Sequence, residues 1–263
     1  MAKFFPMFSG SEGNATYIGG SNGGLLVDVG VSYKRIKQSL QNAEIELSGI
    51  KAVLITHHHS DHVKGLKVFL KNNPVPVVAS KETVYALEFQ GIINSEYPRI
   101  YIDELQSTNF EDMLVKSFPT SHDCKGSCCY TVTLGTGQKV AVCTDLGVMT
   151  DEIVNALSGS TLVMLESNHD PVMLRLGPYT AELKLRIASK EGHLPNAVCA
   201  QTLAQLFTLG TNRFVLAHLS EQNNTPEKAA SATRAALMDK GAKENEDYIL
   251  YIAEKEGKRV INI

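Results

Sequence analysis

The most constraining feature of the sequence is a run of six polar residues, 57–62, that directly follows an apolar segment, 50–56. The apolar segment, IKAVLIT, is short and rich in β-branched residues, which predicts a buried strand. The polar run reads HHHSDH and so has the spacing H-x-H-x-D-H. Imidazole and carboxylate are the ligands that Zn²⁺, Mn²⁺ and Fe²⁺ take in proteins. We therefore predict a metal site at a strand end, because a purification tag would sit at a terminus without the interleaved aspartate.

The composition is that of an ordinary globular protein. The chain has 263 residues, 43% of them hydrophobic and 20% charged, which favours a single domain over 1–263 with a substantial core. The net charge of −3 draws the whole chain to neither nucleic acid nor anionic membrane, so a polyanionic substrate requires local cations or metals. We expect no secretory signal, since the chain turns polar at Ser9, and no membrane span, since no apolar run reaches about 18 residues.

The cysteines favour a reducing compartment. Their number is odd, and in a chain without an export signal they are best interpreted as reduced thiols of a cytoplasmic protein. The spacing C-x3-C-C at 124–129 leaves a structural zinc site open, but no convincing partner pair lies elsewhere in the sequence. We favour packing as small apolar residues for all five: Cys124, Cys128, Cys129, Cys143 and Cys199.

Metal-ligand residue types recur where apolar strands end. We predict strands at 25–27, 161–166 and 213–217. We predict helices at 31–42, 63–71, 179–190 and 226–240, and one more that follows the segment 192–196 and ends at 209. His57, His122, Asp145 and His218 each follow an apolar strand, and Glu166 closes another. One such histidine would more often be structural, but these four positions together with the full H-x-H-x-D-H run at 57–62 are hard to explain that way. Strands alternating with helices in both halves are compatible with two αβ layers packed sheet to sheet.

This pattern resembles the dinuclear hydrolases of the metallo-β-lactamase superfamily. More narrowly, the chain resembles the YycJ/WalJ group of bacterial DNA exonucleases. The shared motifs are SGSEGN at 9–14, PTSHD at 119–123, ESNHD at 166–170, GPY at 177–179, LKLRI at 183–187, GHLPN at 192–196 and AHLS at 217–220. Departures are Glu12, where the group often has serine, and Cys124 after Asp123.

The resemblance implies an α+β fold (αββα), a four-layer metallo-β-lactamase sandwich with two mixed β-sheets flanked by helices. It also implies a 5′-to-3′ exonuclease acting on DNA, with a role in DNA repair. Carried over by position, one metal would be held by His57, His59 and His122, the second by Asp61, His62 and His218, and both by Asp145 as the bridge. A bridging carboxylate suggests metals about 3.5–4 Å apart with a hydroxide nucleophile between them. Asp61 would also orient that hydroxide, and Zn, Mn and Fe all remain open.

Further residues are assigned with less support from the pattern. In nuclease branches of the superfamily a histidine placed like His193 contacts the scissile phosphate or helps the leaving group, against a structural cap as the alternative. Asp28 is expected to support the ligands. Glu166 and His169 are expected to support the ligands too, with contact to the substrate as the alternative, whereas His58 would face solvent or the site mouth. The remaining candidates could bind a terminal phosphate or supply a basic patch, or could be an ordinary turn and a solvated helix face: Ser9, Ser11 and Asn14; Arg175, Lys184, Arg186 and Lys190.

Other functions stay open at this point. An RNA-processing nuclease would be expected to carry an inserted arm or an added domain, and a small-molecule phosphodiesterase would need only the same metals. A lactam hydrolase would be expected to carry an export signal. A di-iron redox protein of this fold usually carries a flavin domain, for which the chain leaves no room, so no flavin is expected. A sensor that merely binds metal would not require the full ligand set, and the oligomeric state stays open.

Overall fold

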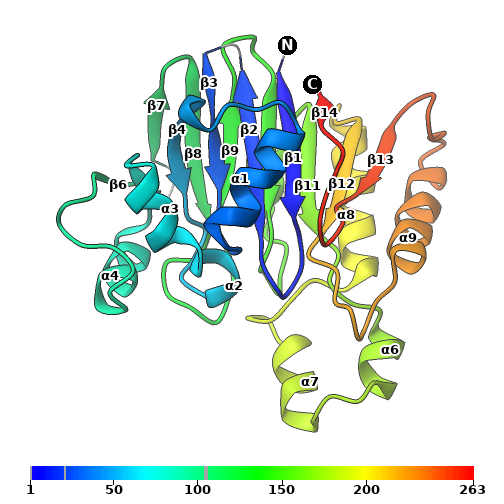
Figure 1. Ribbon diagram of the computed structural model, residues 1–263. Coiled ribbons are helices and arrows are strands. Elements are labelled where there is room, and N and C mark those ends of the chain that lie inside the picture. Colours follow the sequence, from blue (N-terminus) through cyan, green and yellow to red (C-terminus); the bar gives the residue numbers. More distant parts are fainter. Residues whose placement is uncertain (1, 21, 104–105) are drawn as a thin grey trace. The chain divides into compact units, whose positions relative to one another are not determined.

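The computed structural model describes residues 2–20, 22–103 and 106–263. Within these residues the strands form two mixed β-sheets of seven strands each, flanked by helices (Figure 1), which confirms the predicted architecture. The residue contacts group into two compact units. Unit 1 comprises Met1–Pro119, Cys124–Gln138 and Glu254–Ile263, and unit 2 comprises Thr120–Asp123 and Lys139–Ala253. The single domain expected over 1–263 stays a prediction.

Unit 1 contains one complete sheet, with strand order β14-β1-β2-β3-β4-β5-β6. Strands β1 to β3 are antiparallel neighbours, and β3 to β6 run parallel. The predicted strand at 50–56 is β4, which is almost wholly buried, as an apolar strand in a parallel sheet should be. The strands are β1 (Lys3–Phe8), β2 (Ala15–Gly20), β3 (Gly23–Val27), β4 (Ile50–Leu54), β5 (Val77–Ala79), β6 (Arg99–Tyr101) and β14 (Ile261–Asn262).

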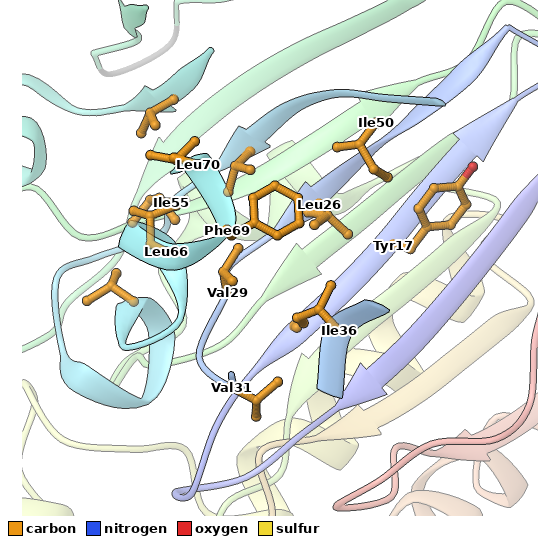
Figure 2. Close-up of a cluster of buried hydrophobic side chains, with 14 of the residues drawn as sticks. Tyr17, Leu26, Val29, Val31, Ile36, Ile50, Ile55, Leu66, Phe69 and Leu70 are labelled. Carbon is orange, nitrogen blue, oxygen red and sulfur yellow. The ribbon is translucent and has the colours of Figure 1, made fainter. Parts of the chain in front are cut away.

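The core of unit 1 lies between this sheet and its helices. Figure 2 shows Ile36 of α1 and Leu66, Phe69 and Leu70 of α3 gathered with side chains of β2, β3 and β4. The phenyl ring of Phe69 is fully buried, so its contacts hold the helix that follows the histidine run against the strands. The helices are α1 (Tyr33–Asn42), the 3₁₀ turn η1 (Leu47–Gly49), α2 (Ser60–Val63), α3 (Leu66–Asn72) and α4 (Lys81–Phe89).

The prediction of one helix over 63–71 is wrong at its start. The structure has two helices there, α2 and α3, with a break at Lys64 and Gly65. Gly65 donates its N–H to the carbonyl of Val29 at 3.0 Å, and a Cβ on Gly65 would collide with the carbonyl oxygen of Val31. The chain must therefore pass close to the end of β3, and this approach replaces a continuous helix. The short α2 carries Asp61 and His62.

The second sheet contributes strands to each unit. In unit 1, β7 (Ser107–Phe110), β8 (Met113–Pro119) and β9 (Cys128–Thr133) are antiparallel neighbours. In unit 2, β10 (Lys139–Cys143), β11 (Leu162–Glu166), β12 (Arg213–Ala217) and β13 (Ile249–Ile252) are parallel neighbours. Because parallel strands end at the same edge, residues that follow β10, β11 and β12 are brought close together.

Two helices of unit 2, Asn196–Thr208 and Pro226–Met238, match the helices predicted to end at 209 and to span 226–240, and the differences lie around residues 170–190. The predicted helix over 179–190 is the shorter α7, and a helix that the sequence analysis did not predict, α6, precedes it. Asp170 begins α6 by accepting the N–H of Met173 at 2.8 Å, with Pro171 in the first turn. The helices are α5 (Asp151–Leu157), α6 (Pro171–Leu176), α7 (Ala181–Ile187), α8 (Asn196–Thr208) and α9 (Pro226–Met238). Within the described residues, none of the helices combines the length and apolarity that crossing a membrane requires.

Candidate metal centre

In unit 1 the ends of β3 and β4 position the histidine run. Asp28 follows β3 and is buried, and its carboxylate accepts the N–H and the hydroxyl of Thr56, both at 2.9 Å. Its Oδ2 also lies 2.8 Å from Nδ1 of His62. Burial raises the pKa of the Asp28 carboxyl above its usual value, although His62 and Thr56 act against this rise. Asp28 thus joins Thr56, directly before the histidine run, to His62 within it, and its role in supporting a metal ligand stays a prediction.

These contacts fix the imidazole tautomers. The hydroxyl of Thr56 donates its one proton to Asp28, so it accepts a hydrogen bond from Nδ1 of His57, 3.0 Å away. Nδ1 of His62 likewise donates to Asp28. With Nδ1 engaged in both rings, Nε2 is the nitrogen that would bind a metal. The His57 and His62 ring centroids lie 4.1 Å apart.

The turn at 9–14 lies against the second part of the run. The side-chain amide of Asn14 closes this turn through Gly10, with hydrogen bonds of 3.0 and 3.1 Å. Its Nδ2 also lies 3.3 Å from Oδ2 of Asp61 and 3.0 Å from Nε2 of His62. Asn14 is therefore adjacent to two predicted ligands. Of the two serines predicted with it, Ser9 is buried and Ser11 is exposed.

The other end of the run brings a thiol into reach. His59 is half-buried and packs edge-on against His57, with ring centroids 4.7 Å apart. Ligand atoms of His57, His59 and Cys124 all lie within 4.8 Å of one another. His58 is half-buried with its ring centroid 5.8 Å from that of His59, and burial lowers the pKa of its imidazole.

In unit 2 three parallel strands bring Asp145, Glu166 and His218 together. Oε1 of Glu166 accepts a hydrogen bond from Nδ1 of His218 at 2.7 Å and from Nδ1 of His193 at 2.8 Å. Its Oε2 accepts the backbone N–H groups of Leu146 and Leu194. Four hydrogen bonds thus hold one fully buried carboxylate.

The charges in this cluster stabilise one another. Burial alone would raise the pKa of the Glu166 carboxyl, but His193 and His218 hold it well below its usual range. Burial would lower the pKa of His193, yet Glu166 and Asp145 raise it above the usual value. Oδ1 of Asp145 lies 3.4 Å from Nδ1 of His218 and 3.7 Å from Nδ1 of His193. In both rings Nδ1 already forms the hydrogen bond to Glu166, so a metal would bind His218 through the other nitrogen, Nε2.

His122 shows the same arrangement with a backbone partner. Nδ1 of His122 lies 3.3 Å from the carbonyl oxygen of Gly192, to which it donates. Nε2 of His122 lies 3.9 Å from Oδ1 of Asp145, so two predicted ligands face each other. A Cβ on Gly192 would collide with the carbonyl oxygens of Arg186 and Ile187, which explains why glycine precedes His193.

Three of the residues at strand ends have an unusual backbone. Asp28, Asp145 and His218 adopt φ values of 62°, 61° and 54°, in the left-handed region that side chains other than glycine seldom enter. Such conformations cost on the order of 1–3 kcal/mol and concentrate at functional sites. Asn168 offsets part of this cost at His218, because its Nδ2 donates to the His218 carbonyl at 3.0 Å. The sequence analysis assigned no role to Asn168, Thr56 or Gly192.

Two of the weaker candidates lie at the margin of the cluster in unit 2. Arg186 forms an ion pair with Asp123, whose other oxygen lies 3.4 Å from Nε2 of His122. His169 is buried beside Pro195, and burial lowers the pKa of its imidazole to about 4. Arg186 thus already has a carboxylate partner, and His169 is neutral at neutral pH.

The donor set fits a divalent transition metal. Imidazole nitrogens converge with a thiol in unit 1 and with carboxylate oxygens in unit 2, and imidazole and carboxylate suit Zn²⁺, Mn²⁺ and Fe²⁺. Four of the predicted ligands donate from Nδ1 to a partner in their own unit and so present Nε2, as metal-ligating histidines usually do. They are His57 and His62 in unit 1 and His122 and His218 in unit 2.

Comparison with known proteins agrees with this chemistry. A beta-lactamase superfamily domain matches residues 25–219. The chain is 36% identical over 240 residues to the exodeoxyribonuclease YycJ of Bacillus anthracis, covering 90% of each chain. It is 33% identical to the exodeoxyribonuclease WalJ of Streptococcus pneumoniae, covering 86% of this chain and 85% of that one. The metallo-beta-lactamase fold protein YhfI from Bacillus subtilis has a similar structure, with a TM-score of 0.72 at 12% identity and full coverage of both chains.

Proposed function

Because the chain belongs to the beta-lactamase superfamily, we propose that it is a metal-dependent hydrolase of phosphodiester bonds and that its substrate is DNA. The observation that carries the proposal is the Glu166–His193 pair, which lies beside the predicted ligands Asp145 and His218. Phosphodiester hydrolysis needs metal ligands and, beside them, a proton donor for the leaving oxygen. His193 supplies that donor, and its imidazole is held in place by the buried carboxylate of Glu166.

The metal ligands that we propose are those implied by the family resemblance. One metal would be held by His57, His59 and His122 and the second by Asp61, His62 and His218, with Asp145 available to both. Metals bound there would act as Lewis acids, activating water near neutral pH and offsetting charge on the phosphate. Zinc, manganese and iron all suit these ligands.

Three side chains would orient the nucleophile, donate the proton and hold the histidines in place. Asp61 accepts a hydrogen bond from the nucleophile and so orients it. His193 carries a proton on Nε2 while Nδ1 donates to Glu166, and the Nε2 proton passes to the oxygen of the departing nucleotide. Glu166 and Asp145 raise the pKa of His193 above its usual value, against the effect of burial, and so favour the protonated ring. Glu166 keeps its charge throughout and orients His193 and His218 together.

The choice of DNA rests on two further considerations. The relatives that align over most of their length are named exodeoxyribonucleases. In addition, the exposed side chains of Arg175 and Lys190 add local positive charge around α6 and α7, which the net charge of −3 does not provide. Lys184 joins these helices by donating to the carbonyl of Arg175 at 2.9 Å. We propose that these cations contact the DNA backbone. We also propose that the enzyme digests DNA in the 5′-to-3′ direction and acts in DNA repair.

The cellular location that we propose is the cytoplasm. All five cysteines are free thiols, and four of them are buried, which suits a reducing compartment.

A degradation assay tests the proposed function. Metal-reconstituted protein is incubated with end-labelled double- and single-stranded DNA, with RNA, and with a generic phosphodiester, and bound metal is counted per chain. We expect release of nucleotides from DNA 5′ ends and two metal ions per chain, both strongly reduced in Asp145→Ala. Asp239→Ala, which removes an exposed carboxylate after α9, is the matched control and should behave as wild type. Cleavage of RNA alone would make it an RNA-processing nuclease, and cleavage of the generic ester alone a small-molecule phosphodiesterase.

A further inference from the structure

Cys124 lies next to two histidines that belong to the proposed ligand set. Its Sγ and the ligand atoms of His57 and His59 are mutually within 4.8 Å, and all three residues belong to unit 1. Zn–N and Zn–S bonds of about 2.0–2.3 Å place neighbouring ligands of one zinc ion about 3–4 Å apart. The three side chains therefore need only small rotations to share one ion.

The backbone around Cys124 is anchored to the strand end that carries His57. The N–H of Cys128 donates to the carbonyl of Thr56 at 3.1 Å, directly before His57. Two residues after Cys124, the carbonyl of Gly126 accepts the hydroxyls of Ser80 at 2.7 Å and Thr83 at 3.3 Å at the start of α4. The position of the thiol is thus determined by contacts on its C-terminal side.

Gly126 lies where this loop comes very close to the start of α4. Its φ is +77°, and a Cβ there would collide with Oγ of Ser80. The loop can pack against α4 only with glycine at this position. Cys124 is also the one cysteine that is partly exposed, whereas Cys128, Cys129, Cys143 and Cys199 are buried. A buried thiol in apolar surroundings is inert, but a partly exposed thiol beside two imidazoles is accessible to an ion from solvent.

We propose that Cys124 is a thiolate ligand of the metal held by His57 and His59, and that it makes this position selective for zinc over manganese. The inference rests on the proposed function in so far as it assumes a metal at these two histidines. On coordination the S–H proton is released to solvent, and a sulfur electron pair forms the bond to the metal. Thiolate is a soft ligand that favours zinc, whereas manganese favours carboxylate, carbonyl and water oxygens.

Cobalt(II) spectroscopy of the full chain tests the sulfur bond directly. The metal-free protein is titrated with Co²⁺, and thiolate-to-cobalt charge-transfer absorption is recorded in the near ultraviolet. We expect this absorption in wild type and in Cys199→Ala, a control that removes a buried cysteine of α8, and its loss in Cys124→Ser. Zinc affinity should fall on the order of tenfold or more in Cys124→Ser, the cost typical even for a residue that only orients a ligand, while manganese affinity changes less.

Thiol titration gives a second readout that does not depend on activity. Ellman's reagent should react with one thiol in the metal-free native protein, on the order of tenfold more slowly once zinc is bound, and with none in native Cys124→Ser. Cobalt binding without charge-transfer absorption, or equal reactivity with and without zinc, would overturn the role of Cys124 and leave the proposed function intact. If wild type binds no cobalt, and His57→Ala therefore changes nothing, the proposed function itself fails.

Discussion

The two units hold their histidines in different ways. In unit 1, the carboxylate of Asp28 accepts a hydrogen bond from Nδ1 of His62, and the hydroxyl of Thr56 accepts one from Nδ1 of His57. In unit 2, a single oxygen of Glu166 accepts two hydrogen bonds, one from Nδ1 of His193 and one from Nδ1 of His218. The support is therefore distributed in unit 1 and concentrated in unit 2. A change at Glu166 should release a metal ligand and the proton donor together, whereas a change at Asp28 removes the acceptor of one ligand, His62, and leaves Thr56 beside the other, His57.

The largest effect expected within this comparison is that of His193→Ala. His193 shares Glu166 with His218 but is not itself a proposed ligand, so its loss should lower kcat by about 10²–10⁴-fold, the usual contribution of a general acid. Metal content should stay near wild type, as measured by elemental analysis of the purified protein. His58→Ala, which removes a half-buried imidazole of unit 1, serves as the matched control and should retain most activity. Loss of metal from the His193 variant would instead identify His193 as a ligand.

The next effect compares the two carboxylates directly. Glu166→Gln replaces the shared acceptor by an amide, so the Nδ1 groups of His193 and His218 can no longer both donate to a charged oxygen. We expect kcat/KM to fall by on the order of 100-fold in Glu166→Gln and about 10-fold in Asp28→Asn, within the range typical of residues that orient metal ligands. Steady-state kinetics at saturating metal measure both variants side by side. An equal or larger loss in Asp28→Asn would show that the support in unit 1 is not distributed.

The sequence predicted the ends of the strands better than the contacts that support them. His57, Asp145 and His218 could be named because each follows a local apolar pattern, which sequence displays directly. The acceptor of His122 could not, because it is the backbone carbonyl of Gly192, 70 residues away, and a carbonyl leaves no mark on its own residue type. The only trace is the glycine itself, which the close packing of residues 186–192 requires.

Cys124 and the break after α2 illustrate two other limits. Cys124 has no ligand spacing of its own, and it reaches His57 only because Cys128 pairs with Thr56 across the fold. The helix over 63–71 had the correct apolar period, yet the contact of Gly65 with the end of β3 divided it. In both cases a long-range backbone contact decided the outcome, and local periodicity does not encode such contacts.

The last effect expected concerns stability rather than catalysis, a pH dependence that separates the buried His169 of unit 2 from His58 of unit 1. Burial lowers the pKa of folded His169 to about 4, against an unfolded value of 6.5, so between these values the unfolded state binds more protons. Stability should then fall as the pH falls, by about 2 kcal/mol from pH 7 to pH 5 for this residue alone. Urea unfolding of metal-free protein measures the change, which should be smaller in His169→Gln and reduced less in His58→Gln, because His58 is only half-buried. A wild-type profile that His169→Gln leaves unchanged would mean that this imidazole takes up its proton equally well in the folded chain.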